Sequence, residues 1–195
     1  MDTQDARYAE QRLGAESVWW KRLLDVQRPY RAHLRGLDLG FVLEIGCGIG
    51  RNLAHLRGSS VGVDHNGRAV EIARKRGLVA YTPEQLRGSV WATAGRFDSL
   101  LFSHVLEHMS AAQASGLVRA YVDLLRGGGR AVVMTPQEAG FRSDPTHVEY
   151  MDFEKVDAVV REAGLRVERR YSFPLPRLAG MVFKYNEFVT IASKP

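Results

Sequence analysis

A glycine-rich segment and a downstream aspartate have the spacing that most clearly suggests a ligand site. Residues 42–50 read VLEIGCGIG, with Gly46, Gly48 and Gly50 at alternate positions. Such glycines let the backbone turn tightly and approach a ligand without Cβ clashes. Asp64 ends the next apolar run, near the roughly 20-residue offset expected for a carboxylate that binds ribose hydroxyls. The pattern favours a nucleotide-type ligand; the alternative is a structural turn beside a surface aspartate.

The same segment distinguishes two kinds of nucleotide ligand. A dinucleotide site favours Gly-x-Gly-x-x-Gly, which places a pyrophosphate at a helix N-terminus, but Arg51 stands at the third glycine position here. Glu44 lies two residues before Gly46, where a carboxylate suits a positively charged ligand. We therefore favour an amino-acid-bearing nucleoside, S-adenosylmethionine (SAM), over NAD.

Three histidines have the chemistry of a general base, because the unperturbed imidazole pKa lies near about 6.5. His104 follows an apolar run, His108 lies one helical turn later, and His147 lies in the loop segment DPTHVEY. We rank His147 first as the base and His104 second. The alternatives are a lining residue of the ligand pocket for His104, a helix-cap or packing role for His108, and a loop anchor for His147.

Alternating strands and helices are expected to position these residues. Apolar runs predict strands, and amphipathic segments between them predict helices. The predicted strands are 41–45, 60–64, 78–82, 97–102, 130–136, 166–173 and 187–192, and the predicted helices are 51–56, 68–75, 111–125 and 153–164. The glycines at 127–129 are expected to end the third helix. This alternation predicts an α/β fold with a parallel sheet, whose final two strands can pair antiparallel.

Two segments outside that alternation are candidates for covering the site. Residues 1–37 are predicted to form an N-terminal helical cover, and residues 38–195 are predicted to form the ligand-binding domain. We expect the two parts to make up a single domain overall. The aromatic residues Tyr8, Trp19 and Trp20 either form a lid over the site or pack the helix onto the core. Residues 174–186 predict a loop whose Met181, Phe183 and Tyr185 line an apolar acceptor pocket or simply pack.

The motifs together resemble the class I SAM-dependent methyltransferases. Five segments carry the resemblance, which covers roughly residues 40–192: VLEIGCGIGRN (42–52), VGVDHN (61–66), FDSLLFSHVLEHM (97–109), LLRGGGRAVVMTP (124–136) and THVEYMDFEKVDAVVREAGLRV (146–167). The resemblance implies a Rossmann-like, doubly wound seven-stranded sheet, mostly parallel with a last antiparallel strand. It also implies SAM as the cofactor and S-adenosylhomocysteine (SAH) as its product.

The resemblance assigns SAM contacts by position. Gly46, Cys47 and Gly48 are expected beside the methionine part, with Glu44 and Gly50 in the same turn. Asp64 is expected on the ribose hydroxyls and His65 beside the adenine. Backbone at Ser103 and the His104 side chain are expected near the methionine and sulfonium. The family often has an aspartate after the third strand; this chain has Thr82, so we assign the adenine contact to Thr82, Pro83 and Glu84.

No metal is expected from the sequence. Metal-dependent methyltransferases of the catechol type use carboxylates and an amide, and no Asp–Asn pair stands at the corresponding places here.

Composition limits the remaining possibilities. The 195 residues contain one cysteine, which excludes a disulfide scaffold and a multi-cysteine zinc site. The polar start and the lack of an apolar run of about 18 residues predict a cytoplasmic protein without membrane association. The formal charge of +5 permits nucleic-acid binding, but the basic residues are scattered, which favours a solvated surface. We expect a monomer or homodimer.

The sequence therefore predicts transfer of a methyl group from SAM to an O or N atom of a small-molecule acceptor. Two alternatives stay open: a methyltransferase acting on RNA or protein, and a non-catalytic SAM-binding partner protein.

Overall fold

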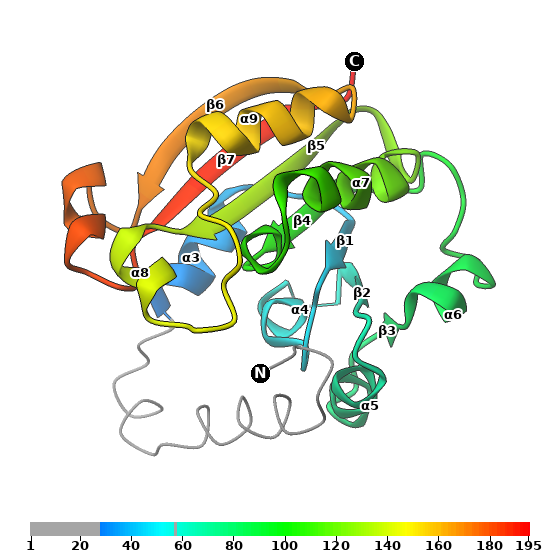
Figure 1. Cartoon of the computed structure of the whole chain (residues 1–195). Coiled ribbons are helices and arrows are strands. Elements are labelled where there is room, and N and C mark those ends of the chain that lie inside the picture. Colours follow the sequence, from blue (N-terminus) through cyan, green and yellow to red (C-terminus); the bar gives the residue numbers. More distant parts are fainter. Residues whose placement is uncertain (1–27, 57) are drawn as a thin grey trace. The chain divides into compact units, whose positions relative to one another are not determined.

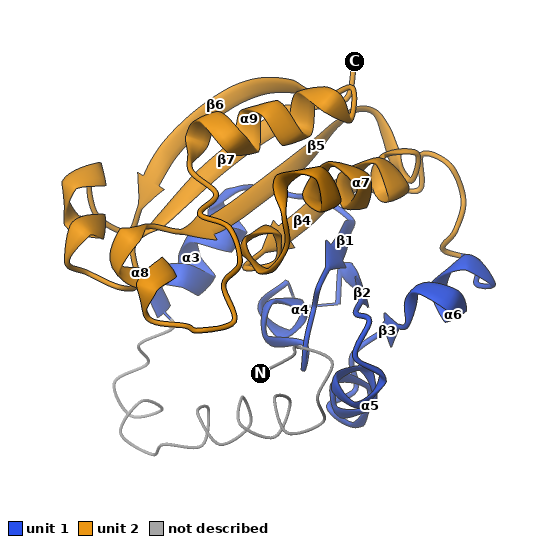
Figure 2. Ribbon diagram, in the orientation of Figure 1, with its two compact units in different colours: residues 1–90 blue, residues 91–195 orange. Residues whose placement is uncertain are grey.

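The computed structural model describes residues 28–56 and 58–195 (Figure 1). The chain divides into two compact units, residues 1–90 (unit 1) and 91–195 (unit 2), which Figure 2 colours separately. The expected helical cover at residues 1–37 is described only from Arg28 onward, so Tyr8, Trp19 and Trp20 lie outside the described residues. Within the described residues, no helix is long and apolar enough to cross a membrane.

Unit 1 alternates helices with three parallel strands. Its elements are α3 (Arg28–Gly36), β1 (Val42–Ile45), α4 (Arg51–His55), β2 (Ser60–Val63), α5 (Gly67–Lys75), β3 (Ala80–Tyr81) and α6 (Pro83–Arg87). The strands lie in the order β3-β2-β1, and each pair is parallel. Every residue of β1 and β2 is buried, as expected for strands covered on both faces.

Unit 2 contains the other four strands. Its elements are β4 (Phe97–Ser103), η1 (Leu106–His108), α7 (Ala111–Val122), β5 (Leu125–Pro136), α8 (Glu138–Arg142), α9 (Phe153–Glu162), β6 (Arg166–Phe173), η2 (Arg177–Met181) and β7 (Glu187–Ser193). The strand order is β4-β5-β7-β6; β4 and β5 are parallel, and β7 is antiparallel to both β5 and β6. Helices α7 and α9 pack side by side over these strands (Figure 1).

The expected fold class is confirmed: the seven strands form a mostly parallel α/β arrangement in which the last strand is antiparallel. The predicted helix end at residues 127–129 is wrong. Helix α7 ends at Val122, and the three glycines lie within β5, where pairing with β4 shifts between Phe97 and Ser99. A Cβ at Gly129 would lie 2.9 Å from the carbonyl oxygen of Asp98, so Gly129 permits the close approach of two backbones.

Candidate functional site

The glycine turn of unit 1 is held against the end of β2 by backbone hydrogen bonds. The amides of Gly46 and Cys47 both donate to the carbonyl oxygen of Val63, at 2.8 and 3.1 Å. Gly46, Gly48 and Gly50 all have positive φ, between 53° and 83°, which glycine adopts at little cost. The predicted tight turn between β1 and α4 is therefore present.

Asp64 connects this turn to the start of α5. Its carboxylate accepts the Gly48 amide at 2.7 Å on one oxygen and the Asn66 amide at 2.8 Å on the other. The residue is 8% exposed, and each oxygen keeps a second lone pair. Asp64 thus has a structural role in the turn as well as free acceptor capacity toward hydroxyl groups. His65, half-exposed, lies beside it, with Nδ1 3.8 Å from the carboxylate.

The two glycines after Cys47 have different roles. A Cβ on Gly48 would meet nothing within 4 Å, so this position borders open space. A Cβ on Gly50 would lie 2.4 Å from Leu78 Cδ1 and 3.3 Å from Ala73 Cβ. The predicted ligand approach therefore fits Gly48, whereas Gly50 permits close packing of the turn against the following βα segment.

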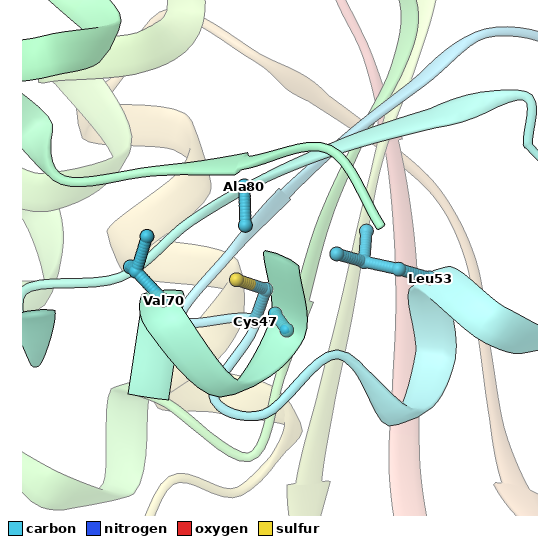
Figure 3. Close-up of a cluster of buried hydrophobic side chains, with 5 residues drawn as sticks. Cys47, Leu53, Val70 and Ala80 are labelled. Carbon is cyan, nitrogen blue, oxygen red and sulfur yellow. The ribbon is translucent and has the colours of Figure 1, made fainter. Parts of the chain in front are cut away.

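The Cys47 side chain points into the core of unit 1. Figure 3 shows its sulfur among Leu53, Val70 and Ala80, and Ala73 belongs to the same buried cluster. Burial raises the pKa of the Cys47 thiol well above its ordinary value. Only the backbone of Cys47 is left for the expected contact with the methionine part, because its side chain fills a hydrophobic cluster.

Glu44 is a buried carboxyl group at the end of β1. It is 2% exposed; Oε1 accepts a hydrogen bond from Asn52 Nδ2 at 2.7 Å, and Oε2 is buried without a hydrogen-bond partner. Burial raises the pKa of Glu44 to about 8, against the lowering effect of the Asn52 hydrogen bond. A buried acid with one unused oxygen is suited to a positively charged or hydrogen-donating ligand group.

The residues expected at the adenine begin a helix that the sequence analysis missed. Thr82 caps α6: its hydroxyl accepts the Gln85 amide at 3.4 Å, and Gln85 Oε1 accepts the Thr82 amide at 3.1 Å. Pro83 is the first helical residue, and the exposed Glu84 pairs with Arg87 at 3.3 Å. The pattern Thr-Pro-Glu-Gln is a capping box with proline at the first position, so the signal was present in the sequence.

In unit 2, His104 follows β4 directly and lies between two carboxylates. Its Nε2 is 2.7 Å from Glu187 Oε1, and its Nδ1 is 3.3 Å from Glu107 Oε1. The residue has φ of 57°, and its amide donates to the Met134 carbonyl oxygen at 3.0 Å. Burial opposes the charged form, but Glu187 and Glu107 outweigh it and raise the pKa of His104 to about 10. Ser103, the last residue of β4, is buried.

The other two predicted histidines meet each other although 39 positions separate them. Their ring centroids lie 5.0 Å apart at 62°. His147 Nδ1 is 2.8 Å from the Phe141 carbonyl oxygen, and the His147 side chain is only 8% exposed. His108 Nδ1 is 3.1 Å from the Thr146 carbonyl oxygen. The His147 ring is thus anchored to α8, and the His108 ring to the loop between α8 and α9.

Comparison with known proteins identifies the family. A family model described as a methyltransferase domain matches residues 21–170, which is most of the chain. The chain belongs to the methyltransferase domain family. The resemblance to class I SAM-dependent methyltransferases is thereby confirmed. A search of curated proteins finds no match.

Solved structures share the fold of this methyltransferase domain at low sequence identity. A SAM-dependent methyltransferase from Archaeoglobus fulgidus is 18% identical with a TM-score of 0.67, over 91% of this chain and 98% of that one. A magnesium protoporphyrin IX methyltransferase from Synechocystis with bound SAH is 14% identical with a TM-score of 0.60, over 88% and 86%. The 4+2 cyclase SpnF is 21% identical with a TM-score of 0.60, over 90% and 81%.

The methyltransferase domain thus presents two groups of the predicted site residues, each within its own unit. Unit 1 brings Glu44, Gly48 and Asp64 to the carboxyl ends of β1 and β2. Unit 2 brings the three histidines together around Glu107, which the sequence analysis did not single out. Glu187 and Asn52 were also missed, because single residues of these types carry no signal until burial and neighbours are known.

Proposed function

We propose that this protein transfers a methyl group from SAM to an O or N atom of a small-molecule acceptor, leaving SAH. The observation that carries the proposal is the arrangement of Gly48, Asp64 and Glu44 at one end of β1 and β2. Gly48 borders open space, Asp64 keeps acceptor capacity toward ribose hydroxyls, and Glu44 holds an unused buried oxygen. These are the requirements of a nucleoside that carries a cationic amino-acid group.

Methyl transfer from a sulfonium needs little chemistry from the protein. The methyl group is already activated, so catalysis consists mainly of orienting the acceptor in line and excluding water. A general base contributes only where the acceptor must lose a proton.

Among the three predicted histidines, exposure favours His104 over His147 for contact with the acceptor. Because its pKa is raised to about 10, His104 is protonated at neutral pH and serves there as a cationic contact rather than as the base. The His104 side chain is 39% exposed, whereas that of His147 is 8% exposed and its Nδ1 already faces the Phe141 carbonyl. Both ring nitrogens of His104 face carboxylates in the ligand-free protein, and the Glu187 contact orients the ring. We therefore assign His104 to the acceptor side of the reaction, with Glu187 as its positioning residue.

An apolar surface supports a small-molecule acceptor over RNA. The segment between β6 and β7 exposes Met181, Phe183 and Tyr185, and the last two rings lie edge to face with centroids 5.7 Å apart. These side chains are therefore not used for core packing. Leu178 and Val182 of the same segment are about four-fifths exposed. Such a surface fits an apolar organic acceptor better than a phosphate backbone.

A ligand comparison tests the proposal. SAM and SAH should each raise the melting temperature of the full chain, and NAD should not. A ligand present at 100 times its Kd stabilises the folded state by about 2.7 kcal/mol. Gly48→Asn places a side chain in the open space at a positive φ that asparagine tolerates better than most residues, so it should abolish the SAM-induced shift while the protein stays folded. A response to NAD alone would overturn the cofactor assignment.

The acceptor is tested with methyl-labelled SAM against hydroxyl and amine compounds, RNA and protein. Label in a small molecule supports the proposal. Label in RNA or protein supports the first alternative, and SAM binding without any transfer supports the non-catalytic one.

A further inference from the structure

Glu107 is a buried carboxylate in unit 2 whose charge is not balanced by hydrogen bonds. It lies in η1, directly after β4, and is 0% exposed. Neither of its carboxylate oxygens has a hydrogen-bond partner. Removing a carboxylate from water without such partners is costly, so a positive charge is expected beside it.

Two imidazoles adjoin this carboxylate. One ligand atom from each of Glu107, His108 and His147 can be chosen so that all three lie within 4.8 Å of one another. His147 Nε2 is 3.9 Å from Glu107 Oε1. Donor atoms that bind one ion at about 2.1 Å in a tetrahedral site lie about 3.4 Å apart, so these three atoms must approach one another by up to about 1.4 Å when an ion binds.

The surroundings orient both rings with a nitrogen available toward the cluster. His147 Nδ1 contacts the Phe141 carbonyl at 2.8 Å, which fixes the proton on Nδ1 and leaves the lone pair on Nε2. His108 Nδ1 contacts the Thr146 carbonyl at 3.1 Å, and the Thr146 hydroxyl donates to Asp144. Carbonyl partners of this kind are typical of the outer shell of a metal site.

We propose that Glu107, His108 and His147 bind one divalent transition-metal ion of the Zn²⁺ or Mn²⁺ type. Two imidazoles and one carboxylate match such ions, whereas Mg²⁺ and Ca²⁺ prefer oxygen ligands. Three protein ligands leave coordination positions open for water or a substrate oxygen. This departs from the expectation of no metal, which rested on a comparison with catechol-type methyltransferases. The inference does not depend on the cofactor assignment.

The competing explanation is a proton. His104 Nδ1 lies 3.3 Å from Glu107 Oε1, so an imidazolium there can balance the carboxylate without a metal. A metal titration separates the two explanations, because only a metal site binds the added ion stoichiometrically.

The test uses the full chain without a polyhistidine tag, stripped with a chelator and titrated by calorimetry in the absence of SAM. We expect one Zn²⁺ or Mn²⁺ per chain and at least tenfold weaker Mg²⁺ binding. Glu107→Gln and His147→Gln should each weaken Zn²⁺ binding by about tenfold to a hundredfold or more. His65→Gln removes a half-exposed imidazole of unit 1 and should leave the affinity within about twofold.

Circular dichroism and melting temperature establish that each variant is folded. If Glu107→Gln fails to fold, the Zn²⁺ affinity of His147→Gln tests the proposal. Visible absorption of the Co²⁺-loaded protein gives a second readout, and its bands should disappear in the ligand variants but not in His65→Gln. Absence of stoichiometric Zn²⁺ or Mn²⁺ binding, or equal affinity in the ligand variants and the control, would overturn the proposal.

Discussion

Glu44 is the residue at which burial most directly shapes ligand preference. Its carboxyl group sits at the end of β1 with a pKa raised by burial to about 8, so it is mostly protonated at neutral pH in the ligand-free protein. Asp64 raises this pKa further, whereas Asn52 and Arg51 lower it. A cationic ligand group beside Glu44 favours the ionised form, so binding should release a proton.

The first prediction concerns this proton. Calorimetry of SAM binding at pH 7 in buffers of different ionisation enthalpy should show proton release, and affinity should rise from pH 6 toward pH 8. Glu44→Gln should weaken SAM binding by roughly tenfold, about 1.4 kcal/mol, and lose the Glu44-linked proton. Glu71→Gln, which alters an exposed carboxylate of α5, is the matched control. Unchanged proton release in Glu44→Gln would reject this role.

The same shift has a consequence for stability. The folded pKa of Glu44 lies above its ordinary value of 4.5, so the folded state binds this proton more tightly than the unfolded state. Its contribution to stability is present below pH 4.5 and is lost as pH rises through about 8. In urea titrations without ligand, Glu44→Gln should therefore gain stability relative to wild type between pH 6 and pH 9.

Asp64 combines two roles, and its replacement should affect both. Asp64→Ala removes the acceptors of the Gly48 and Asn66 amides and the proposed ribose contact. We expect SAM affinity to fall about a hundredfold and stability to fall by about 1–3 kcal/mol, because the buried Asn66 amide and the part-buried Gly48 amide lose their partners. Calorimetry and urea unfolding measure the two losses separately. Wild-type SAM affinity in a folded Asp64→Ala protein is incompatible with the assignment.

At the scale of elements, β2 has to lie very close to the glycine turn. A Cβ on Gly62 would lie 2.8 Å from Cys47 Cβ and 2.6 Å from Cys47 Sγ. Gly62 therefore sets the spacing between β2 and the turn that presents Gly48. The capping box at Thr82 similarly determines where β3 ends and α6 begins.

Gly62→Ala should accordingly destabilise the protein by about 1–3 kcal/mol, because the rigid Cys47 Cβ leaves no room. Gly67→Ala is the matched control: its Cβ would meet nothing within 4 Å, and its position at the start of α5 tolerates alanine. We expect a change within about 0.5 kcal/mol for the control in urea unfolding. Equal stability of the two variants would contradict the close-packing argument.

At the scale of the whole molecule, several arginines of the described residues are paired with carboxylates. Arginines of both units form ion pairs with carboxylates: Arg68 with Glu71, Arg87 with Glu84, Arg126 with Asp98, Arg170 with Asp157 and Arg177 with Glu138. Each of these five arginines is neutralised by its partner, so these residues do not carry the formal net charge of +5. Arginines paired in this way are less available to phosphates, in agreement with the proposed small-molecule acceptor.

RNA binding should consequently be weak. In filter-binding or anisotropy measurements, we expect affinity in the non-specific range, a Kd of about 10⁻⁴–10⁻⁶ M or weaker at 150 mM salt, whatever the RNA sequence. Tight, sequence-dependent binding that persists at this salt concentration would instead support the RNA alternative.

Sequence patterns alone determined the order of the seven strands and of helices α4, α5, α7 and α9, because the period of apolar residues and the glycines and caps at element ends are local properties. They also identified the turn at Gly46–Gly50 and Asp64, whose spacing follows from one βαβ unit. Helix α6 could have been predicted from its capping box, whereas the glycines of β5 resembled a helix stop until their strand pairing was known.

Tertiary structure decided which side chains meet and which are buried. Nothing local indicates that Glu107 is fully buried, that His108 and His147 share its surroundings, or that Glu187 orients His104. It also decided that Cys47 belongs to the core and that Gly50 serves packing. Burial and long-range contact depend on how distant segments pack, and they set the charge and reactivity of each group.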